Sequence, residues 1–306
     1  MQRITDIGTL EGELASWRLH LEAANLSPKT ILGYTFGVQK FADFLKAHGW
    51  PTTVTEITRQ HVEAFMSHIS QTSKPWTAQT RYRDLQQFFR WQVELGELAV
   101  SPMDKLNKPR LSEEPVPVVA EDDLRNLFKA CAGRSFEDRR DTAILSVFVD
   151  TGARLSEVSG LRLEDVVIAR GMSTLYVTGK GRVSRHVSIA RATARDLDRY
   201  NRERSRHRHS DLDWLWLGPR GRLTKSGIAQ MLRRRCREAG IAEIHPHQLR
   251  HTFAHMFLSA GGNEGDLQAL AGWKSPQMLA RYARSTRAER AREAHRKLSP
   301  RDKLEE

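Results

Sequence analysis

The sequence is poor in cysteine and contains no long apolar run. Its two cysteines among 306 residues, Cys131 and Cys236, lie far apart without metal-type spacing, which favours free thiols over a disulfide framework or a zinc site. No apolar stretch approaches the roughly 20 residues of a membrane-spanning helix. The N-terminal residues MQRITDIGTLEGELASW include acidic side chains and lack the apolar region of a signal peptide. We therefore expect a cytoplasmic protein with no membrane partner.

Positive charge is what the sequence has in excess. Lys and Arg number 49 against 37 Asp and Glu, which gives a formal net charge of +12. The basic residues are spread along the whole chain and are not confined to one amphipathic helix, so nucleic acid is favoured over a membrane surface as partner. Hydrophobic residues make up 39% of a chain without low-complexity tracts, so a folded protein of two ordinary domains is expected.

The first hundred residues are predicted to form a small helical bundle, over 1–107. Segment 27–49, SPKTILGYTFGVQKFADFLKAHG, has Ser27 in the N-cap position and Pro28 at the first helical position. Apolar residues recur at helical spacing within it, and no strand pattern is seen in this part of the chain. Two further helices are predicted over 59–69 and 77–95.

A proline-rich stretch separates this bundle from the remainder. Segment 108–118 lies within NKPRLSEEPVPV, whose three prolines cannot continue a helix, so we predict an interdomain linker. In 119–306 helical patterns surround segment 165–190, where β-branched and polar residues alternate around glycines as in an antiparallel meander. The expected fold class is therefore mainly α with a small antiparallel β-sheet: an N-terminal helical bundle plus an α+β domain.

Two stretches of the second domain place charged side chains in unusual settings. In TGARLSEVSGL, Arg154 follows a Gly-Ala turn and Glu157 lies three residues later, within reach on one helical face. Taken alone, such pairs are mostly surface salt bridges. In TGKGRVSRHV, Lys180 lies between two glycines at the expected tip of a hairpin. Taken by itself, this residue is better explained as a solvated turn lysine.

A third stretch, HPHQLRHTFAHMF, carries an arginine and three histidines on one predicted helix. His247 and Arg250 are expected to project away from its apolar side. His247, His251 and His255 are spaced i, i+4 and i+8, which raises the alternative of a metal site. A zinc-protease helix has glutamate after the first histidine, whereas Gln248 stands in that place, and Arg250 adds positive charge. We therefore expect no metal.

The fourth stretch, LAGWKSPQMLARYAR, contains Trp273 and, nine residues later, Tyr282. Tyr282 is either a packed aromatic residue or a nucleophile. A tyrosine hydroxyl has a reference pKa of about 10, so it attacks phosphorus only if its proton is removed or its phenolate is stabilised. Two guanidiniums, on Arg154 and Arg250, could bind the non-bridging oxygens of a phosphodiester and neutralise the developing charge without a metal ion.

The remaining polar residues fit the same chemistry. Lys180 could protonate the departing sugar oxygen, which leaves poorly without a proton. His247 could take the tyrosine proton or hydrogen-bond the phosphate, and Trp273 offers an indole N–H donor. Glu157 has no chemical step of its own and is expected to orient Arg154 or a histidine.

In this order the motifs resemble those of the tyrosine recombinases of the phage integrase family. The matching features are the arginine of TGARLSE, the lysine of GKG, the HxLRH pattern, LAGW, and a tyrosine nine residues later. The resemblance covers nearly the whole chain. It implies a SAM-like, DNA-clamping domain over 1–107, a linker over 108–118, and a tyrosine recombinase catalytic domain with a C-terminal tail over 119–306. Little sequence precedes the first domain, so the chain is more similar to Xer-like recombinases than to integrases with an arm-binding domain.

The resemblance also implies an activity. Tyr282 would form a 3′-phosphotyrosine bond and free a 5′-hydroxyl. The supporting site would comprise Arg154, Lys180, His247, Arg250 and Trp273, with Glu157 in the family's acidic position. Most relatives have histidine at the position of Trp273. The indole of Trp273, unlike a histidine ring, cannot transfer a proton. No cofactor and no ATP are implied, because the covalent link conserves the energy of the broken bond.

The implied partner is a double-stranded DNA recombination site, with a homo-tetramer acting on two such sites for integration, excision or resolution. Two alternatives remain open. One is a type IB topoisomerase-like enzyme that relaxes DNA as a monomer. The other is a DNA-binding relative that has the fold without the chemistry.

Overall fold

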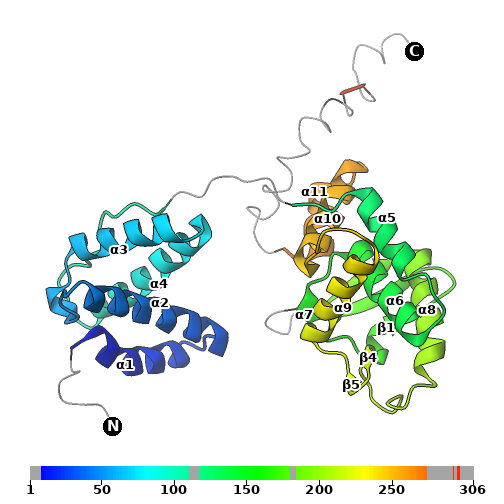
Figure 1. Ribbon diagram of the computed structural model, residues 1–306, viewed down its shortest axis with the longest axis horizontal. Coiled ribbons are helices and arrows are strands. Elements are labelled where there is room, and N and C mark those ends of the chain that lie inside the picture. Colours follow the sequence, from blue (N-terminus) through cyan, green and yellow to red (C-terminus); the bar gives the residue numbers. More distant parts are fainter. Residues whose placement is uncertain (1–7, 110–116, 180–183, 274–291, 293–294, 297–306) are drawn as a thin grey trace. The chain divides into compact units, whose positions relative to one another are not determined.

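The computed structural model describes residues 8–109, 117–179 and 184–273, together with 292, 295 and 296. The chain divides into two compact units, 1–114 and 115–306 (Figure 1). They are called the N-terminal unit and the C-terminal unit below. The division falls inside the segment that the sequence predicts as a linker.

The N-terminal unit is built from helices, as predicted. Its elements are α1 (Leu10–Ala23), α2 (Pro28–Ala47), the 3-10 helix η2 (Val54–Glu56), α3 (Arg59–Thr72) and α4 (Pro75–Glu94). The predicted start of α2 is confirmed, because the Ser27 hydroxyl accepts a hydrogen bond from the backbone N–H of Thr30 at 3.3 Å. Its core is rich in aromatic side chains, with the Trp17 ring edge-on to Phe88 at 5.1 Å between centroids.

Helix α6 is the centre of the C-terminal unit. It packs against α8 and α10, and most of its length is buried. Its described residues form the helices α5 (Glu121–Ala130), α6 (Phe136–Thr151), α7 (Leu155–Val158), η3 (Leu163–Asp165), α8 (Arg191–Arg204), α9 (Lys225–Glu238), α10 (Pro246–Ser259) and α11 (Glu264–Ala271).

The predicted meander is confirmed as a three-stranded antiparallel sheet in the order β1-β2-β3. Its strands are β1 (Val166–Val167), β2 (Ser173–Thr178) and β3 (Ser184–Ile189). Leu175 pairs with Val187 and both are buried, so one face of the sheet packs on the core. A second hairpin, β4 (Leu217–Gly218) with β5 (Gly221–Arg222), was not predicted, because strands of two residues leave no alternating pattern.

Within the described part of the chain, most of the buried apolar residues belong to three clusters. One fills the N-terminal unit and a second, the main core, fills the C-terminal unit. The third is a small cluster between α10 and α11, consisting of Phe253, Ala254, Leu258, Leu267, Ala271 and Trp273. Among the described residues, none of the helices is long and apolar enough to cross a membrane.

Candidate active site

A glycine turn joins α6 to α7 and positions the first predicted site residue. Gly152 ends α6 in the left-handed conformation, with φ of 57°. A Cβ atom at this position would lie 2.3 Å from Cδ1 of Phe253, so only glycine lets α10 approach the turn this closely. Arg154 follows two residues later as the residue that precedes α7.

Arg250 is buried, which differs from its predicted outward orientation on α10. Only 1% of the residue is exposed. Its Nη1 donates to the carbonyl of Gly152 at 2.6 Å, and its Nη2 donates to the carbonyl of Ala271 at 2.7 Å. These carbonyls lie at the C-terminal ends of α6 and α11, where backbone acceptors lack helical partners and the helix dipole is negative. A buried cation is stable here because both helix ends point acceptors at it.

Glu157 and Arg154 meet, as their spacing predicts, but not as a surface ion pair. The Glu157 side chain is only 1% exposed and that of Arg154 is 40% exposed. The carboxylate accepts from the backbone N–H of Arg154 at 2.8 Å and from its Nη1 at 2.9 Å. Burial alone would raise the pKa of Glu157. The net pKa is nevertheless below its ordinary value, because the carboxylate accepts hydrogen bonds from Arg185 and from the Arg154 backbone and lies beside the charge of Arg185. Glu157 is therefore a buried carboxylate that fixes one side of the Arg154 guanidinium.

Arg185 is the residue that the sequence analysis missed. It lies on β3 and its side chain is 15% exposed. Its Nη1 and Nη2 donate to the two carboxylate oxygens of Glu157 at 3.1 and 2.9 Å. The sequence contained one signal that could have identified Arg185. On β3 it lies on the same face as the buried Val187 and Ile189, and a charged residue at such an inward position requires a buried partner.

The remaining predicted residues fall into two groups. Trp273 is buried, and the guanidinium carbon of Arg250 lies 5.4 Å from its ring centroid. His247 is exposed near the start of α10, and its ring contacts that of His251 edge to face at 4.3 Å. Lys180 and Tyr282 lie outside the described residues. Within the described ranges, no three side chains of metal-ligating type are gathered at one point.

The sequence of this chain matches a known protein family in both of its parts. The pattern of the Phage integrase family matches residues 117–289, which is more than half of the chain. The chain belongs to this family. A second pattern, the phage integrase N-terminal SAM-like domain, matches residues 14–96.

Individual members of the phage integrase family match along most of their length. Tyrosine recombinase XerC of Oceanobacillus iheyensis is 32% identical over 285 residues, which cover 90% of this chain and 92% of that protein. Tyrosine recombinase XerD of Listeria monocytogenes is 25% identical over 282 residues, covering 90% and 94%.

Solved structures share the fold. The crystal structure of XerA recombinase matches with a TM-score of 0.51 and 25% identity, over 95% of this chain and 99% of that chain. XerH recombinase, in a post-cleavage complex with its palindromic difH substrate, matches with a TM-score of 0.75 and 17% identity, over 93% and 84%. These matches confirm the tyrosine recombinase fold that the motifs predict.

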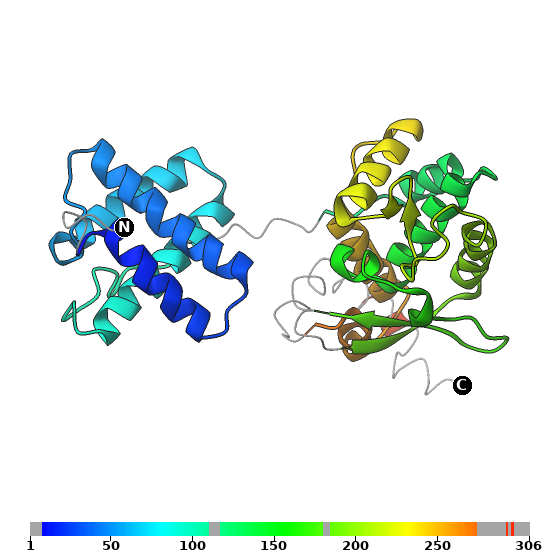
Figure 2. The ribbon, with the colours of Figure 1, turned by 90° about the horizontal axis from the view of Figure 1, so that it is seen from below.

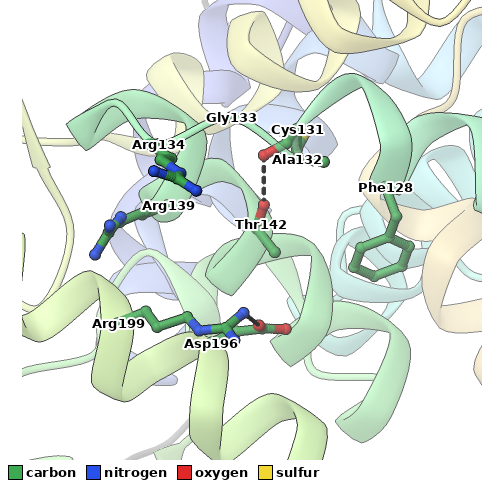
Figure 3. Close-up of a pocket in the computed structure, with 9 residues that line it drawn as sticks. All are labelled: Phe128, Cys131, Ala132, Gly133, Arg134, Arg139, Thr142, Asp196 and Arg199. Atoms are coloured by element: carbon green, nitrogen blue, oxygen red, sulfur yellow. Dashed lines mark hydrogen bonds and ion pairs between the residues drawn. The ribbon is translucent and has the colours of Figure 1, made fainter.

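A pocket of about 460 Å³ lies elsewhere in this family member and includes none of the predicted site residues. Its lining comes from α5, α6, α8 and the loop after α5 (Figure 3). Two of its arginines are already ion-paired, Arg139 with Glu203 at 3.2 Å and Arg199 with Asp196 at 3.9 Å. Asp196 also accepts a hydrogen bond from the Ser146 hydroxyl. These internal pairs make the pocket a feature of packing, and the arginine cluster around Gly152 is the better candidate for chemistry.

Proposed function

We propose that this protein is a site-specific DNA recombinase that cuts and rejoins DNA through a 3′-phosphotyrosine intermediate on Tyr282. Membership of the phage integrase family and the similarity to XerC and XerD support the proposal. The net charge of +12 supports a polyanionic partner. The biological outcome would be integration, excision or resolution of DNA.

One geometric observation carries the proposal: Arg250 is anchored to the turn that presents Arg154. The carbonyl of Gly152, two residues before Arg154, accepts the 2.6 Å hydrogen bond from Arg250. Glu157 holds Nη1 of Arg154, and 40% of the Arg154 side chain remains accessible. Two guanidiniums fixed by the same turn form a rigid cationic site suited to a phosphate. We propose that they bind the non-bridging oxygens of the scissile phosphodiester.

The proposed cleavage step balances without a redox or nucleotide cofactor. The Tyr282 oxygen forms a bond to phosphorus, the bond from phosphorus to O5′ breaks, and its electron pair passes to O5′. Lys180 gives that oxygen a proton, so a 5′-hydroxyl leaves, and His247 accepts the proton of Tyr282. Trp273 supports the site by packing and by its N–H, because an indole does not transfer protons.

Rejoining reverses this step with a hydroxyl from another DNA strand. We propose that four copies of the chain act on two sites, with 1–107 as the DNA-clamping domain, 108–118 as linker and 119–306 as catalytic domain. The similar fold of a lambda integrase solved as a tetramer bound to a Holliday junction supports this assembly (TM-score 0.69, 18% identity). The expected location is the cytoplasm, where the chromosome is accessible.

The test is trapping of a covalent protein–DNA complex. A DNA site selected by binding is nicked beside the expected cleavage position, so that the short fragment diffuses away after cleavage. Wild type, Tyr282→Phe and the control Tyr176→Phe, whose residue is 37% exposed on β2, are compared on denaturing gels with EDTA present. A covalent band for wild type and Tyr176→Phe alone is expected.

Two other outcomes would refute the proposal. Binding of the site without a covalent band from wild type would favour a non-catalytic DNA-binding relative. Relaxation of supercoiled plasmids that lack the site would favour the topoisomerase alternative.

A further inference from the structure

Arg185 joins three elements of the C-terminal unit. It lies on β3, donates to both carboxylate oxygens of Glu157 on α7, and donates from Nε to the carbonyl of Leu270 on α11 at 3.0 Å. Figure 2 shows the end of α11, in orange, beside the strands of the sheet. Its two partners are 28 and 85 residues away in sequence, so this side chain ties together segments that are distant along the chain.

The carboxylate of Glu157 is shared between Arg185 and Arg154. Its Oε1 accepts from Nη1 of Arg154 at 2.9 Å and from Nη1 of Arg185 at 3.1 Å. Its Oε2 accepts from the backbone N–H of Arg154 at 2.8 Å and from Nη2 of Arg185 at 2.9 Å. Each oxygen therefore accepts one hydrogen bond from each arginine. The carboxylate cannot turn toward one arginine without losing a bond to the other.

Of these two arginines, only Arg154 is accessible to a ligand. Each of the three side-chain nitrogens of Arg185 already donates to a protein acceptor. Only 15% of its side chain is exposed, compared with 40% for Arg154. A Cβ atom on Gly272 would lie 3.1 Å from Nη1 of Arg185, so the backbone that follows α11 packs closely against this guanidinium. Arg185 is thus suited to holding other groups in place.

The charges of this cluster give Arg185 a second effect. Two guanidiniums and one carboxylate leave one net positive charge. Without Arg185, the carboxylate of Glu157 and the guanidinium of Arg154 would form a neutral pair, which attracts a phosphate oxygen less strongly. The Glu157 side chain is 1% exposed, so water screens its negative charge little and a neighbouring cation must offset it.

The Nε end of Arg185 lies beside a support of the other proposed phosphate-binding residue. The Leu270 carbonyl accepts from Arg185, and the next carbonyl along the chain, that of Ala271, accepts from Nη2 of Arg250 at 2.7 Å. Consecutive carbonyls at the end of α11 therefore hold Arg185 and Arg250. Arg185 connects this helix end to the carboxylate that holds Arg154.

We infer that Arg185 is a positioning residue: it fixes Glu157 and offsets its charge, so that the Arg154 guanidinium is held in place and stays electropositive toward the scissile phosphate. This role rests on the proposed function, because that function assigns Arg154 to the phosphate. It adds the residue on which the placement and the charge of Arg154 depend. Loss of Arg185 should therefore impair neutralisation of charge at phosphorus.

A substrate without charge at phosphorus separates this effect from a general loss of structure. In a phosphodiester, the two non-bridging oxygens share one negative charge, which the arginines are proposed to bind. In a methylphosphonate, a methyl group replaces one of these oxygens and the linkage is neutral, while the same bond from phosphorus to O5′ breaks. Neutralisation by Arg154 then matters less. A variant that is defective only in this neutralisation should recover relative to wild type.

The experiment measures covalent-complex formation by the full chain on nicked sites that carry a phosphodiester or a methylphosphonate at the cleavage position. On phosphodiester, Arg154→Ala should react about 100-fold or more slowly than wild type, and Arg185→Ala about 10- to 100-fold more slowly, since it displaces the guanidinium without removing it. On methylphosphonate both variants should react within about fivefold of wild type. The double variant should be no slower than Arg154→Ala alone, because both changes remove the same interaction.

Two further variants separate a positioning role from a purely structural one. Arg235→Ala removes another buried arginine of this unit, which donates to Asp138 and Asp141 of α6. Any loss that it causes should be equal on the two substrates. Arg185→Lys keeps the charge without the fork, so its loss should be smaller than that of Arg185→Ala and should also shrink on methylphosphonate. This variant provides the test if Arg185→Ala fails to fold.

Three results would overturn the inference. Equal losses of the Arg185 variants on both substrates would show that Arg185 supports only the fold. A double variant much slower than Arg154→Ala would show that Arg185 acts independently of Arg154. Wild-type rates for Arg185→Ala and Arg185→Lys would show that the contact is dispensable. If wild type forms no covalent complex on the phosphodiester, the proposed function fails as well, whereas a failure confined to the Arg185 variants leaves that function standing.

Discussion

Replacing Gly152 with alanine adds one methyl group at the most crowded turn of the proposed site. Two free-energy costs follow from the structure. The left-handed φ of 57° costs an L-residue about 1–2 kcal/mol. The new Cβ would lie 2.3 Å from Cδ1 of Phe253, so the ring or α10 must shift, at about 1–3 kcal/mol for overpacking. The free energy of unfolding of the C-terminal unit should fall by about 2–5 kcal/mol, the sum of the two estimates.

Gly240 provides a matched control for this substitution. Its φ is 68°, also left-handed, but a Cβ there would meet nothing within 4 Å. Gly240→Ala should therefore cost only the conformational part, about 1–2 kcal/mol. The difference between the two variants isolates the contact with Phe253.

Hydrogen exchange measured by mass spectrometry on the full chain is the suitable assay. A denaturant curve would mix the transitions of two units, whereas exchange is resolved along the sequence. The slowest amides of α6 should exchange faster in Gly152→Ala than in Gly240→Ala, by a factor of about ten for each 1.4 kcal/mol. Equal acceleration in both variants would refute the role given to the Phe253 contact.

Three further outcomes are expected. The pKa of Glu157 is lower in the folded protein than its ordinary value of 4.5, so the ionised carboxylate stabilises the C-terminal unit above pH 4.5, and this stabilisation is lost as the pH falls through the folded pKa. Glu157→Gln lacks this carboxylate, so its thermal stability should fall less in acid than that of wild type. A pH profile of thermal stability identical to that of wild type would contradict this. Arg250→Lys cannot reproduce the fork to two carbonyls, so covalent-complex formation should fall about 100-fold while affinity for the DNA site, measured by gel shift, changes less than about threefold. Burial raises the pKa of the Cys131 thiol to about 12, and Cys236 is also buried. Both thiols should therefore react slowly with a disulfide reagent in native buffer and fast in urea. A rapid reaction in native buffer would disprove their burial.

Local patterns in the sequence predict much of the fold. Helix α2 is specified by Ser27, Pro28 and a repeating apolar face, and all three signals lie within one segment. The β2–β3 hairpin is specified by alternation on both sides of its glycines. In each case the signal and the structure that it predicts involve neighbouring residues.

The site was only partly predictable because its decisive contacts join distant segments. The spacing of Arg154 and Glu157 correctly predicted their contact. The acceptors of Arg250 are backbone carbonyls, 98 and 21 residues away in sequence, which no side-chain pattern records. Arg185 likewise depends on Glu157 and on a carbonyl of α11, so its importance is seen only after folding.

The arginines of α9 show the same limit. The apolar residues Ile228, Met231 and Leu232 of this helix are buried, and Arg235 is buried too, at 6% exposure. Asp138 and Asp141 of α6 each accept a hydrogen bond from it at 2.8 Å. A helical pattern cannot reveal that a neighbouring helix supplies carboxylates to one of several similar arginines.

The small apolar cluster between α10 and α11 has a consequence for dynamics. Among the described residues this cluster contains six buried side chains, whereas the main core of the C-terminal unit contains 28. Fewer buried contacts mean a lower free energy of local opening, so α11 can detach while the main core stays folded. Detachment would remove the Ala271 carbonyl from Arg250 and the Leu270 carbonyl from Arg185 together. The two guanidiniums thus share acceptors at the end of one helix, so a local opening of α11 would release both contacts while the main core stays folded.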